Sequence, residues 1–324
     1  MIALLHAVRG EGGAVEQYVG HIAEALGDEG TLVDVGGEAP LRELVRILRR
    51  LRPSVAHVMD VWPQAVVAAR VARVPRVLVT HHTPELPRRD NLAGRTWQRL
   101  GWLARPEVIY TSETDRARDG RRPSHVIALG IDLGRFEGVE PALRSDRPLV
   151  GNVARLAPQK DHRTLIEAAR LVPEADFVVA GEGELRDELE RLARGSNVRF
   201  LGTRDDIPAV LASLDAFAFP SLFEGLCVAV IEAQAAGVPV AATPVGGIRE
   251  TVVDGETGLV VPTGDPPALA AAIRRLLEDR PLAEALAAEA KRRVLERFSI
   301  ERMVEETLRL YGETTASRSP RSGV

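Results

Sequence analysis

The sequence alternates between short apolar segments and longer segments with helical periodicity over most of its length. The apolar segments are rich in β-branched residues and have the length of strands buried on both faces of a sheet. They are IALLH (2–6), VAHVM (55–59), RVLVT (76–80), EVIYT (107–111), PLVGNVA (148–154), DFVVAG (176–181), VRFLG (198–202), AFAFP (216–220) and VPVAAT (238–243). Strands that alternate with helices form parallel sheets covered by helices. We therefore predict an α/β protein built from doubly wound domains.

The chain of 324 residues is long enough for two such domains. The segment GVEPALRSDRP at 138–148 is polar, contains proline and lacks periodicity, so it marks the boundary. Two Rossmann-like domains of similar size are then expected to face each other across a cleft. The predicted parts are an N-terminal domain at 1–138, a linker at 139–147, a C-terminal domain at 148–297, a C-terminal helix at 298–312 that packs back towards the N-terminal domain, and a disordered tail at 313–324.

Composition and charge exclude several classes of protein. The formal net charge of -4 at pH 7 and the pI near 6.0 do not fit a general nucleic-acid-binding protein. Cys227 is the only cysteine, so we expect no intramolecular disulfide and a reducing compartment. The N-terminus lacks the basic region of a signal peptide, and no apolar run reaches the roughly 18 residues of a membrane-spanning helix. We therefore expect a cytoplasmic protein.

Two cations follow the predicted strand at 148–154, where ligands of open α/β sheets bind. Arg155 and Lys160 are five residues apart. A guanidinium can bind two phosphate oxygens while an ammonium acts as a compact positive charge, so the pair suits a diphosphate. The alternative is two solvated surface cations. Lys160 is one of only two lysines among 42 basic residues, which favours the diphosphate site.

Two carboxylates occur in the otherwise apolar segment EGLCVAVIE. Glu224 precedes the helix predicted at 226–236, and Glu232 lies about two turns inside it. Buried carboxylates need partners, and the vicinal hydroxyls of a ribose or another sugar are suitable donors. The main-chain N–H groups of 225–228 would line the same site. The alternative is a pair of capping or salt-bridged glutamates.

The first half of the chain contributes two weaker motifs. HAVRGEGGAVEQ places Gly10, Gly12 and Gly13 after the first predicted strand, and we expect a second strand to end at Asp34. This arrangement suits a phosphate but lacks the third glycine of a dinucleotide-binding motif. VLVTHHTPE places His81 and His82 after the strand at 76–80. One of them can donate a hydrogen bond to a phosphate or sugar, and a structural role is the alternative. No metal-binding spacing is present, so we predict neither a metal nor a cofactor.

The order and spacing of these motifs resemble those of the retaining glycosyltransferases of family 4, the glycosyl transferases group 1, over residues 1–312. EGLCVAVIE is similar to the Glu-x7-Glu motif of that family, and VARLAPQKDHRTLIEA is similar to its Arg/Lys diphosphate segment. ALGIDLGRF (128–136) and GGIRETVVDGETGLVVPTGDP (246–266) resemble two further blocks. The resemblance implies the GT-B architecture, with the acceptor bound by the N-terminal domain and the nucleotide sugar by the C-terminal domain.

The resemblance also implies a role for each candidate residue. Among the catalytic residues, Arg155 and Lys160 hold the diphosphate and stabilise the leaving nucleotide. Glu224 grips the transferred sugar, and His82 reaches that sugar near the reacting centre. The donor-binding residues are Glu232 at the ribose, Gly13 at the phosphate, and the main-chain groups of Gly225, Leu226, Cys227 and Val228 at the sugar.

Three departures from the family pattern concern the acceptor side. The first-domain motif is G-G-A-V-E, so Glu16 is displaced by one position. Ala128 and Leu129 replace the usual Pro-Asn before the G-I-D stretch. The chain is also short for the family, mainly in the acceptor-binding domain. These departures leave the identity of the acceptor open.

The sequence thus predicts a retaining hexosyltransferase that uses a nucleotide-diphosphate sugar, with UDP favoured over GDP, and a hydroxyl acceptor. A lipid-linked compound and a small molecule are both compatible acceptors. An NAD(P)-dependent oxidoreductase and a non-catalytic nucleotide-sugar-binding protein of the same fold are the alternatives. Arg42, Arg46, Arg49 and Arg50 share one face of a predicted helix and suit peripheral contact with an anionic membrane, although we favour a solvated face.

Overall fold

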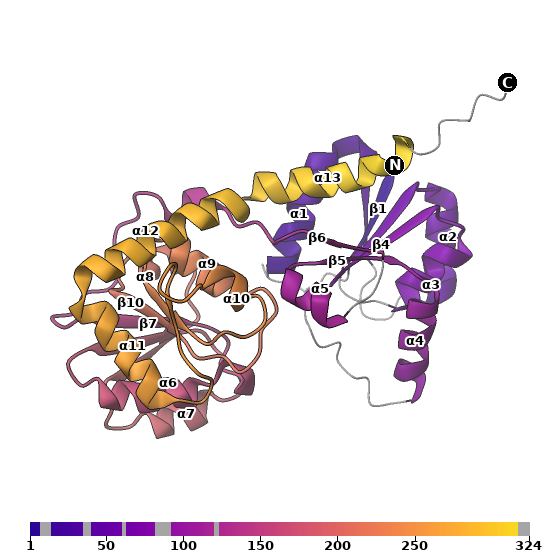
Figure 1. Cartoon of the computed structure of the whole chain (residues 1–324). Coiled ribbons are helices and arrows are strands. Elements are labelled where there is room, and N and C mark those ends of the chain that lie inside the picture. Colours follow the sequence, from indigo (N-terminus) through magenta and orange to yellow (C-terminus); the bar gives the residue numbers. More distant parts are fainter. Residues whose placement is uncertain (7–13, 35–39, 60–62, 82–91, 120–122, 317–324) are drawn as a thin grey trace. The chain divides into compact units, whose positions relative to one another are not determined.

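The computed structural model describes residues 1–6, 14–34, 40–59, 63–81, 92–119 and 123–316 (Figure 1). The chain forms two compact units, Met1–Gly130 with Ile300–Val324, and Ile131–Ser299. Each unit contains a six-stranded sheet whose strands pair in parallel. The predicted α/β class with two parallel sheets is therefore confirmed.

The first unit is a sheet in the order β2-β1-β3-β4-β5-β6 with helices on both faces. In Figure 1, α2, α3 and α4 lie on one side of this sheet, and α1 and α13 lie on the other. Apolar residues of α2 and α3 pack on inward-facing residues of β1, β3 and β4 to form the core. The elements are β1 (Ile2–His6), α1 (Ala14–Leu26), η1 (Gly27–Glu29), β2 (Gly30–Asp34), α2 (Leu41–Leu51), β3 (Val55–Met59), α3 (Pro63–Val71), β4 (Arg76–His81), α4 (Leu92–Leu103), β5 (Glu107–Tyr110), α5 (Glu113–Asp119), β6 (Ser124–Val126) and α13 (Ile300–Ala316).

Buried polar contacts hold α13 on the first unit. His57 of β3 is fully buried, and its ring nitrogens hydrogen-bond the Tyr311 hydroxyl at 2.5 Å and Thr80 Oγ1 at 2.6 Å. Arg76 of β4 donates to the main-chain oxygen of Leu310 and also forms a bidentate pair with Glu107. A buried polar group that loses its partner is costly, so these contacts fix the position of α13 as well as stabilising it.

The second unit is a sheet in the order β12-β11-β10-β7-β8-β9. The direction of winding reverses between β7 and β10, which pair directly (Val150 with Ala216, Gly151 with Phe217). The elements are η2 (Leu133–Phe136), β7 (Leu149–Val153), η3 (Pro158–Lys160), α6 (His162–Leu171), β8 (Asp176–Ala180), α7 (Arg186–Leu192), β9 (Val198–Gly202), α8 (Ile207–Leu211), β10 (Ala216–Phe219), α9 (Val228–Ala235), β11 (Val240–Ala242), α10 (Ile248–Thr251), β12 (Leu259–Val260), α11 (Pro266–Glu278) and α12 (Arg280–Arg297). Such a reversal opens a crevice at the carboxyl ends of the two central strands, where ligands bind.

The structure differs from the sequence-based expectation at several boundaries. The expected linker at 139–147 belongs to the second unit, because Ala142 N donates to Ala209 O at 3.0 Å and Leu143 N donates to Ser213 Oγ at 2.9 Å. The tail expected from residue 313 is helical as far as Ala316. Strands β6 and β12 were not predicted, since three and two residues are too short to show a pattern. None of the described helices is long and apolar enough to cross a lipid bilayer.

We predict that Tyr311→Phe lowers the free energy of unfolding of the first unit by about 1–3 kcal/mol, because it removes the buried hydrogen bond between Tyr311 and His57. All three tryptophans of the chain lie within 1–130, so urea denaturation followed by tryptophan fluorescence reports on this unit. The control is Glu305→Gln on the exposed side of the same helix, which should change that energy by less than about 0.5 kcal/mol. Equal stability of Tyr311→Phe and the wild type would show that the buried contact does not hold α13.

Candidate active site

The loop after β7 carries the two cations and is held close to the neighbouring strand β8. Ala154 N donates to Ala180 O at 3.0 Å, and Leu156 N donates to Glu182 O at 2.9 Å. The approach requires glycine, because a Cβ on Gly181 would lie 2.0 Å from Ala154 O. The backbone of the loop is thereby fixed. The Arg155 side chain is exposed and has no polar partner among the described residues.

The loops after β7 and β10 are joined by an ion pair between Lys160 and Glu224. Lys160 Nζ lies 2.6 Å from Glu224 Oε1, and the two side chains are only 15% and 7% exposed. Ser221 Oγ donates to the same carboxylate oxygen at 2.5 Å. Lys160 Nζ also lies 5.1 Å from the centre of the Phe219 ring. Glu224 is therefore salt-bridged through Oε1, whereas Oε2 has no hydrogen bond among the described residues, so a sugar hydroxyl can still bind there.

The turn that carries Glu224 is fixed on both sides. Leu222 N donates to Gln159 O at 2.8 Å, which ties the turn to the Lys160 loop. On the other side, Gly247 N donates to Gly225 O at 2.9 Å. Gly246, with φ of 51°, lies so close that a Cβ would be 1.8 Å from Glu224 O. Glycine is therefore required at position 246 beside the turn.

The start of α9 presents free main-chain donors beside this turn. Cys227 is the N-cap residue of α9 and provides no side-chain cap. Within the described part of the chain, no hydrogen bond uses the N–H groups of Leu226, Cys227 or Val228. Burial, together with the charge of Glu224, raises the pKa of the Cys227 thiol to about 12, so the thiol is neutral. Free N–H groups at a helix start bind oxygens that carry negative charge.

Glu232 lies on α9 without a hydrogen bond or ion pair among the described residues. Burial raises the pKa of its carboxyl to about 7, and the charge of Arg135 opposes this shift. An unpaired carboxylate with a raised pKa is typical of a functional site that awaits hydrogen-bond donors. The structure thus separates the two glutamates: Glu224 is paired, and Glu232 is not.

His162, a buried histidine that was not among the predicted site residues, lies next to the loop after β7 and contacts β7 itself. His162 Nε2 lies 3.1 Å from Asn152 Oδ1, and Asn152 Nδ2 donates to Ala218 O of β10 at 2.8 Å. Burial and the charge of Lys160 lower the pKa of His162 to about 4, so the ring is neutral. A neutral ring adds no charge beside Lys160. Its only signal in the sequence is its place directly after the Lys160 loop.

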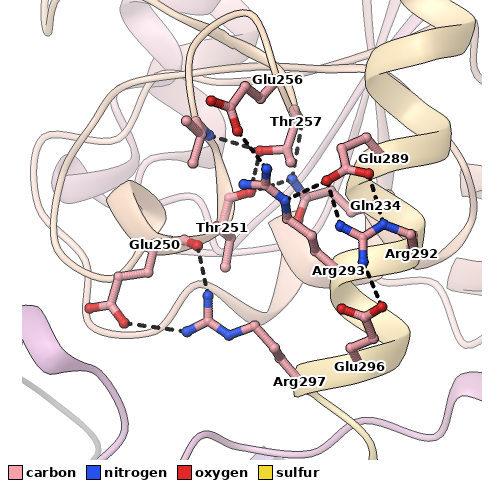
Figure 2. A network of polar contacts seen from close by, with 11 residues as sticks. Gln234, Glu250, Thr251, Glu256, Thr257, Glu289, Arg292, Arg293, Glu296 and Arg297 are labelled. Atoms are coloured by element: carbon pink, nitrogen blue, oxygen red, sulfur yellow. Dashed lines mark hydrogen bonds and ion pairs between the residues drawn. The ribbon is translucent and has the colours of Figure 1, made fainter.

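Helix α12 contacts the loop that contains Glu256, in the same segment as Gly246 and Gly247 (Figure 2). Arg293 pairs with Glu256 of this loop at 2.5 Å and with Glu289 of its own helix at 2.7 Å. Gln234 Nε2 of α9 donates to Thr251 O at 2.9 Å and to Thr257 O at 3.3 Å. The segment GGIRETVVDGETG, which the sequence analysis noted only for its resemblance, is therefore tied to both α9 and α12.

The remaining candidates lie in the first unit. Gly13 and His82 fall outside the described residues. His81 is buried at the end of β4, with its ring 5.8 Å from that of Tyr110. Glu16 lies in the first turn of α1. No group of three or more His, Cys, Asp or Glu side chains suited to a metal occurs among the described residues.

The chain is similar to known glycosyltransferases. Residues 137–293 match the family model "Glycosyl transferases group 1". The chain is 29% identical over 332 residues to "Lipopolysaccharide core biosynthesis glycosyltransferase LpsE" of Rhizobium meliloti (strain 1021), which covers 93% of this chain and 96% of that protein. It is 30% identical over 299 residues to "D-inositol 3-phosphate glycosyltransferase" of Salinispora arenicola (strain CNS-205), covering 82% of this chain and 64% of that protein.

Solved structures share the fold. HepE of Anabaena in complex with UDP superposes with a TM-score of 0.80 at 22% identity, over 96% of this chain and 99% of that one. Sucrose-phosphate synthase of Thermosynechococcus elongatus also gives a TM-score of 0.80 at 22% identity, over 98% and 99% of the two chains. The α/β fold with two parallel sheets is therefore shared with these proteins.

The raised pKa of Glu232 predicts a pH dependence of stability. The folded state holds this proton more tightly than the unfolded chain, so the stabilisation is complete below about pH 4.5 and is lost as the pH rises through about 7. Between about pH 5 and 8, the melting temperature of the ligand-free wild type should therefore fall relative to that of Glu232→Gln. Glu184→Gln, at an exposed glutamate of the same unit, should follow the wild type. Parallel profiles of Glu232→Gln and the wild type would rule out this titration.

Proposed function

We propose that this chain, a group 1 glycosyltransferase of the GT-B fold, transfers a sugar from a nucleotide-diphosphate donor to a hydroxyl acceptor with retention of configuration. The observation that carries the proposal is the paired Lys160 and Glu224 at the reversal between β7 and β10. The pair lies beside an exposed Arg155 and the unused amides of α9. Cations and free N–H groups at one edge of a sheet suit a diphosphate and the sugar attached to it.

Lys160 and Arg155 have different tasks in this proposal. Lys160 is held in place by Glu224 and has two further N–H donors for the leaving phosphate. Arg155 is free to close on the diphosphate with two parallel hydrogen bonds. Negative charge develops on the leaving phosphate as the bond to the sugar breaks, and prearranged cations stabilise it. Loss of one such donor costs about 3–4 kcal/mol in other enzymes.

The two glutamates accept hydrogen bonds from different parts of the donor. Glu224 Oε2 and the amides of Leu226 to Val228 are available to the hydroxyls of the transferred sugar. Glu232 is available to the ribose, whose two vicinal hydroxyls would lower its raised pKa by favouring the carboxylate. Gly13 and His82 lie outside the described residues, and we keep the roles that the resemblance implies for them: Gly13 for the phosphate and His82 for the transferred sugar. We assign no residue as a nucleophile, and the acceptor attacks from the face of the leaving group.

The proposed donor is a UDP sugar, and no metal or cofactor is required. The similar HepE of Anabaena is described in complex with UDP and with UDP-glucose, which supports uridine over guanosine. The acceptor side departs most from the family pattern, so a lipid-linked saccharide and a small molecule are both retained as acceptors. The proposed localisation is the cytoplasm, where nucleotide sugars are available.

We predict that UDP raises the melting temperature of the wild type more than GDP, ADP, NAD or NADP does. A ligand at 100 times its dissociation constant adds about 2.7 kcal/mol to the free energy of unfolding, which is easily measured. Lys160→Ala and Glu232→Ala should lose this shift. Lys291→Ala removes the other lysine of the chain and should keep it. A shift with NAD alone, or an unchanged shift in both variants, would contradict the proposed donor site.

We also predict slow hydrolysis of a UDP-α-sugar that releases the α-anomer first. Water replaces the unidentified acceptor in this reaction, so proton NMR during the first turnovers reports the stereochemistry directly. Lys160→Ala should lower the rate about 100-fold or more. Initial release of the β-anomer would exclude retention, and UDP binding without any turnover would favour a nucleotide-sugar-binding protein.

A further inference from the structure

Three helices of the first unit are followed by an arginine with left-handed backbone. Arg52, Arg73 and Arg105 have φ of 49°, 61° and 48° and follow α2, α3 and α4. Glycine is the usual residue in this conformation after a helix, and a side chain there costs about 1–2 kcal/mol. Asp161 is the only other non-glycine residue with positive φ in the described part of the chain, and it caps α6. The three arginines therefore occupy positions where glycine would be more stable.

These helix ends form one continuous surface, made of residues 46–54, 70–76 and 99–107, which we call the three-helix end. The helices pack side by side and run back from the carboxyl edge to the amino edge of the parallel sheet (Figure 1). Arg49 Nη2 donates to Val71 O at 3.4 Å, which joins the ends of α2 and α3. Arg70 donates to Ala104 O and Arg105 O, both at 2.9 Å, which joins the ends of α3 and α4.

The three-helix end is strongly basic in a protein of net charge -4. Its three segments contain nine arginines and one acidic residue, Glu107, which is neutralised by Arg76 at 2.6 Å. Six of the arginines have side chains without a hydrogen bond or ion pair among the described residues: Arg46, Arg50, Arg52, Arg73, Arg99 and Arg105. Cations that have no partner within the protein are available to an external anion.

Exposed apolar side chains lie among these arginines. Leu103 is 75% exposed, Val71 is 46% exposed and Leu100 is 42% exposed. Nucleic acids bind cationic surfaces mainly through their phosphates, so exposed leucines at the ends of helices would not contribute to that binding. Arginines mixed with exposed leucines are typical of surfaces that bind the interface of an anionic membrane.

We propose that the three-helix end binds an anionic lipid surface, with its arginines at the lipid phosphates and Leu103 inserted below the headgroups. This surface is not the α2 face that the sequence predicted from Arg42, Arg46, Arg49 and Arg50. Arg42 lies at the start of α2, whereas the three-helix end lies at its carboxyl end. None of its residues is among the proposed donor-binding or catalytic residues, most of which lie in the second unit. Lipid binding can therefore be measured without a donor or an acceptor, and its outcome is independent of the proposed function.

The test is co-sedimentation of the full chain with phosphatidylcholine vesicles that contain no phosphatidylglycerol or about 40 mol% of it, at about 50 and 150 mM NaCl. The test variant combines R52G, R73G and R105G, which place glycine where the backbone already suits it, so the variant should melt no lower than the wild type. The control combines R144Q, R194Q and R199Q, at exposed arginines of the second unit, and lowers the net charge equally. A further variant, Leu103→Ser, tests insertion.

We expect the wild type to bind only the anionic vesicles, with weaker binding at the higher salt concentration. The triple glycine variant should bind roughly 100-fold more weakly, since each arginine near an anionic surface contributes about a fivefold gain in affinity. The control should bind as the wild type does, and Leu103→Ser should bind more weakly at both salt concentrations. Binding to neutral vesicles, no binding at all, equal binding of the glycine variant, or an equal loss in the control would overturn the proposal. Tighter binding of duplex DNA than of the vesicles, with no effect of Leu103→Ser, would assign the surface to polyanions instead.

Discussion

The ion pair between Lys160 and Glu224 is the contact on which the arrangement of the second unit's site depends. Glu224 is buried, and a buried carboxylate without a partner is so costly that removal of one member of such a pair typically destabilises a protein by about 3–5 kcal/mol. The pair can form only because the winding of the sheet reverses between β7 and β10 and brings their carboxyl ends together. In return, it fixes two loops that are 64 residues apart in the sequence. The site is therefore organised before any ligand arrives.

Some groups of the site already have a hydrogen-bond or ion-pair partner within the protein, and others do not. Lys160, Glu224, Ser221 and His162 already have partners, and they hold the geometry in place. Arg155, the amides at the start of α9 and Glu232 have none among the described residues, and they remain available to a ligand. Preorganised groups need no rearrangement when charge develops, whereas the free groups supply the affinity. Glu232, which has no hydrogen-bond donor among the described residues, accordingly has a pKa that burial raises to about 7.

Much of the fold and part of the site were predictable from the sequence. The apolar strands were found because burial on both faces of a parallel sheet leaves continuous β-branched runs. Lys160 was predicted as a candidate site residue because lysine is rare in this chain. Its pairing with Glu224 was not predicted, because spacing along the chain does not reveal which residues face each other. The contact of His57 with Tyr311 spans 254 positions and has no local signal at all. The linker was placed wrongly for a related reason: polar loops such as 139–147 can still hydrogen-bond to a neighbouring helix.

The position of α13 has a consequence for folding during synthesis. The sheet of the first unit is built from residues that precede the second unit in the chain, yet one face of it is covered by residues 300–316, which are translated after the second unit. Until then, the buried ring of His57 has no Tyr311 to bind, and the face of the sheet that receives α13 is exposed. Domains generally fold in order as they leave the ribosome. Here the second unit, which is continuous in sequence, can fold completely before the first unit, because the first unit needs α13, which is translated after the whole of the second.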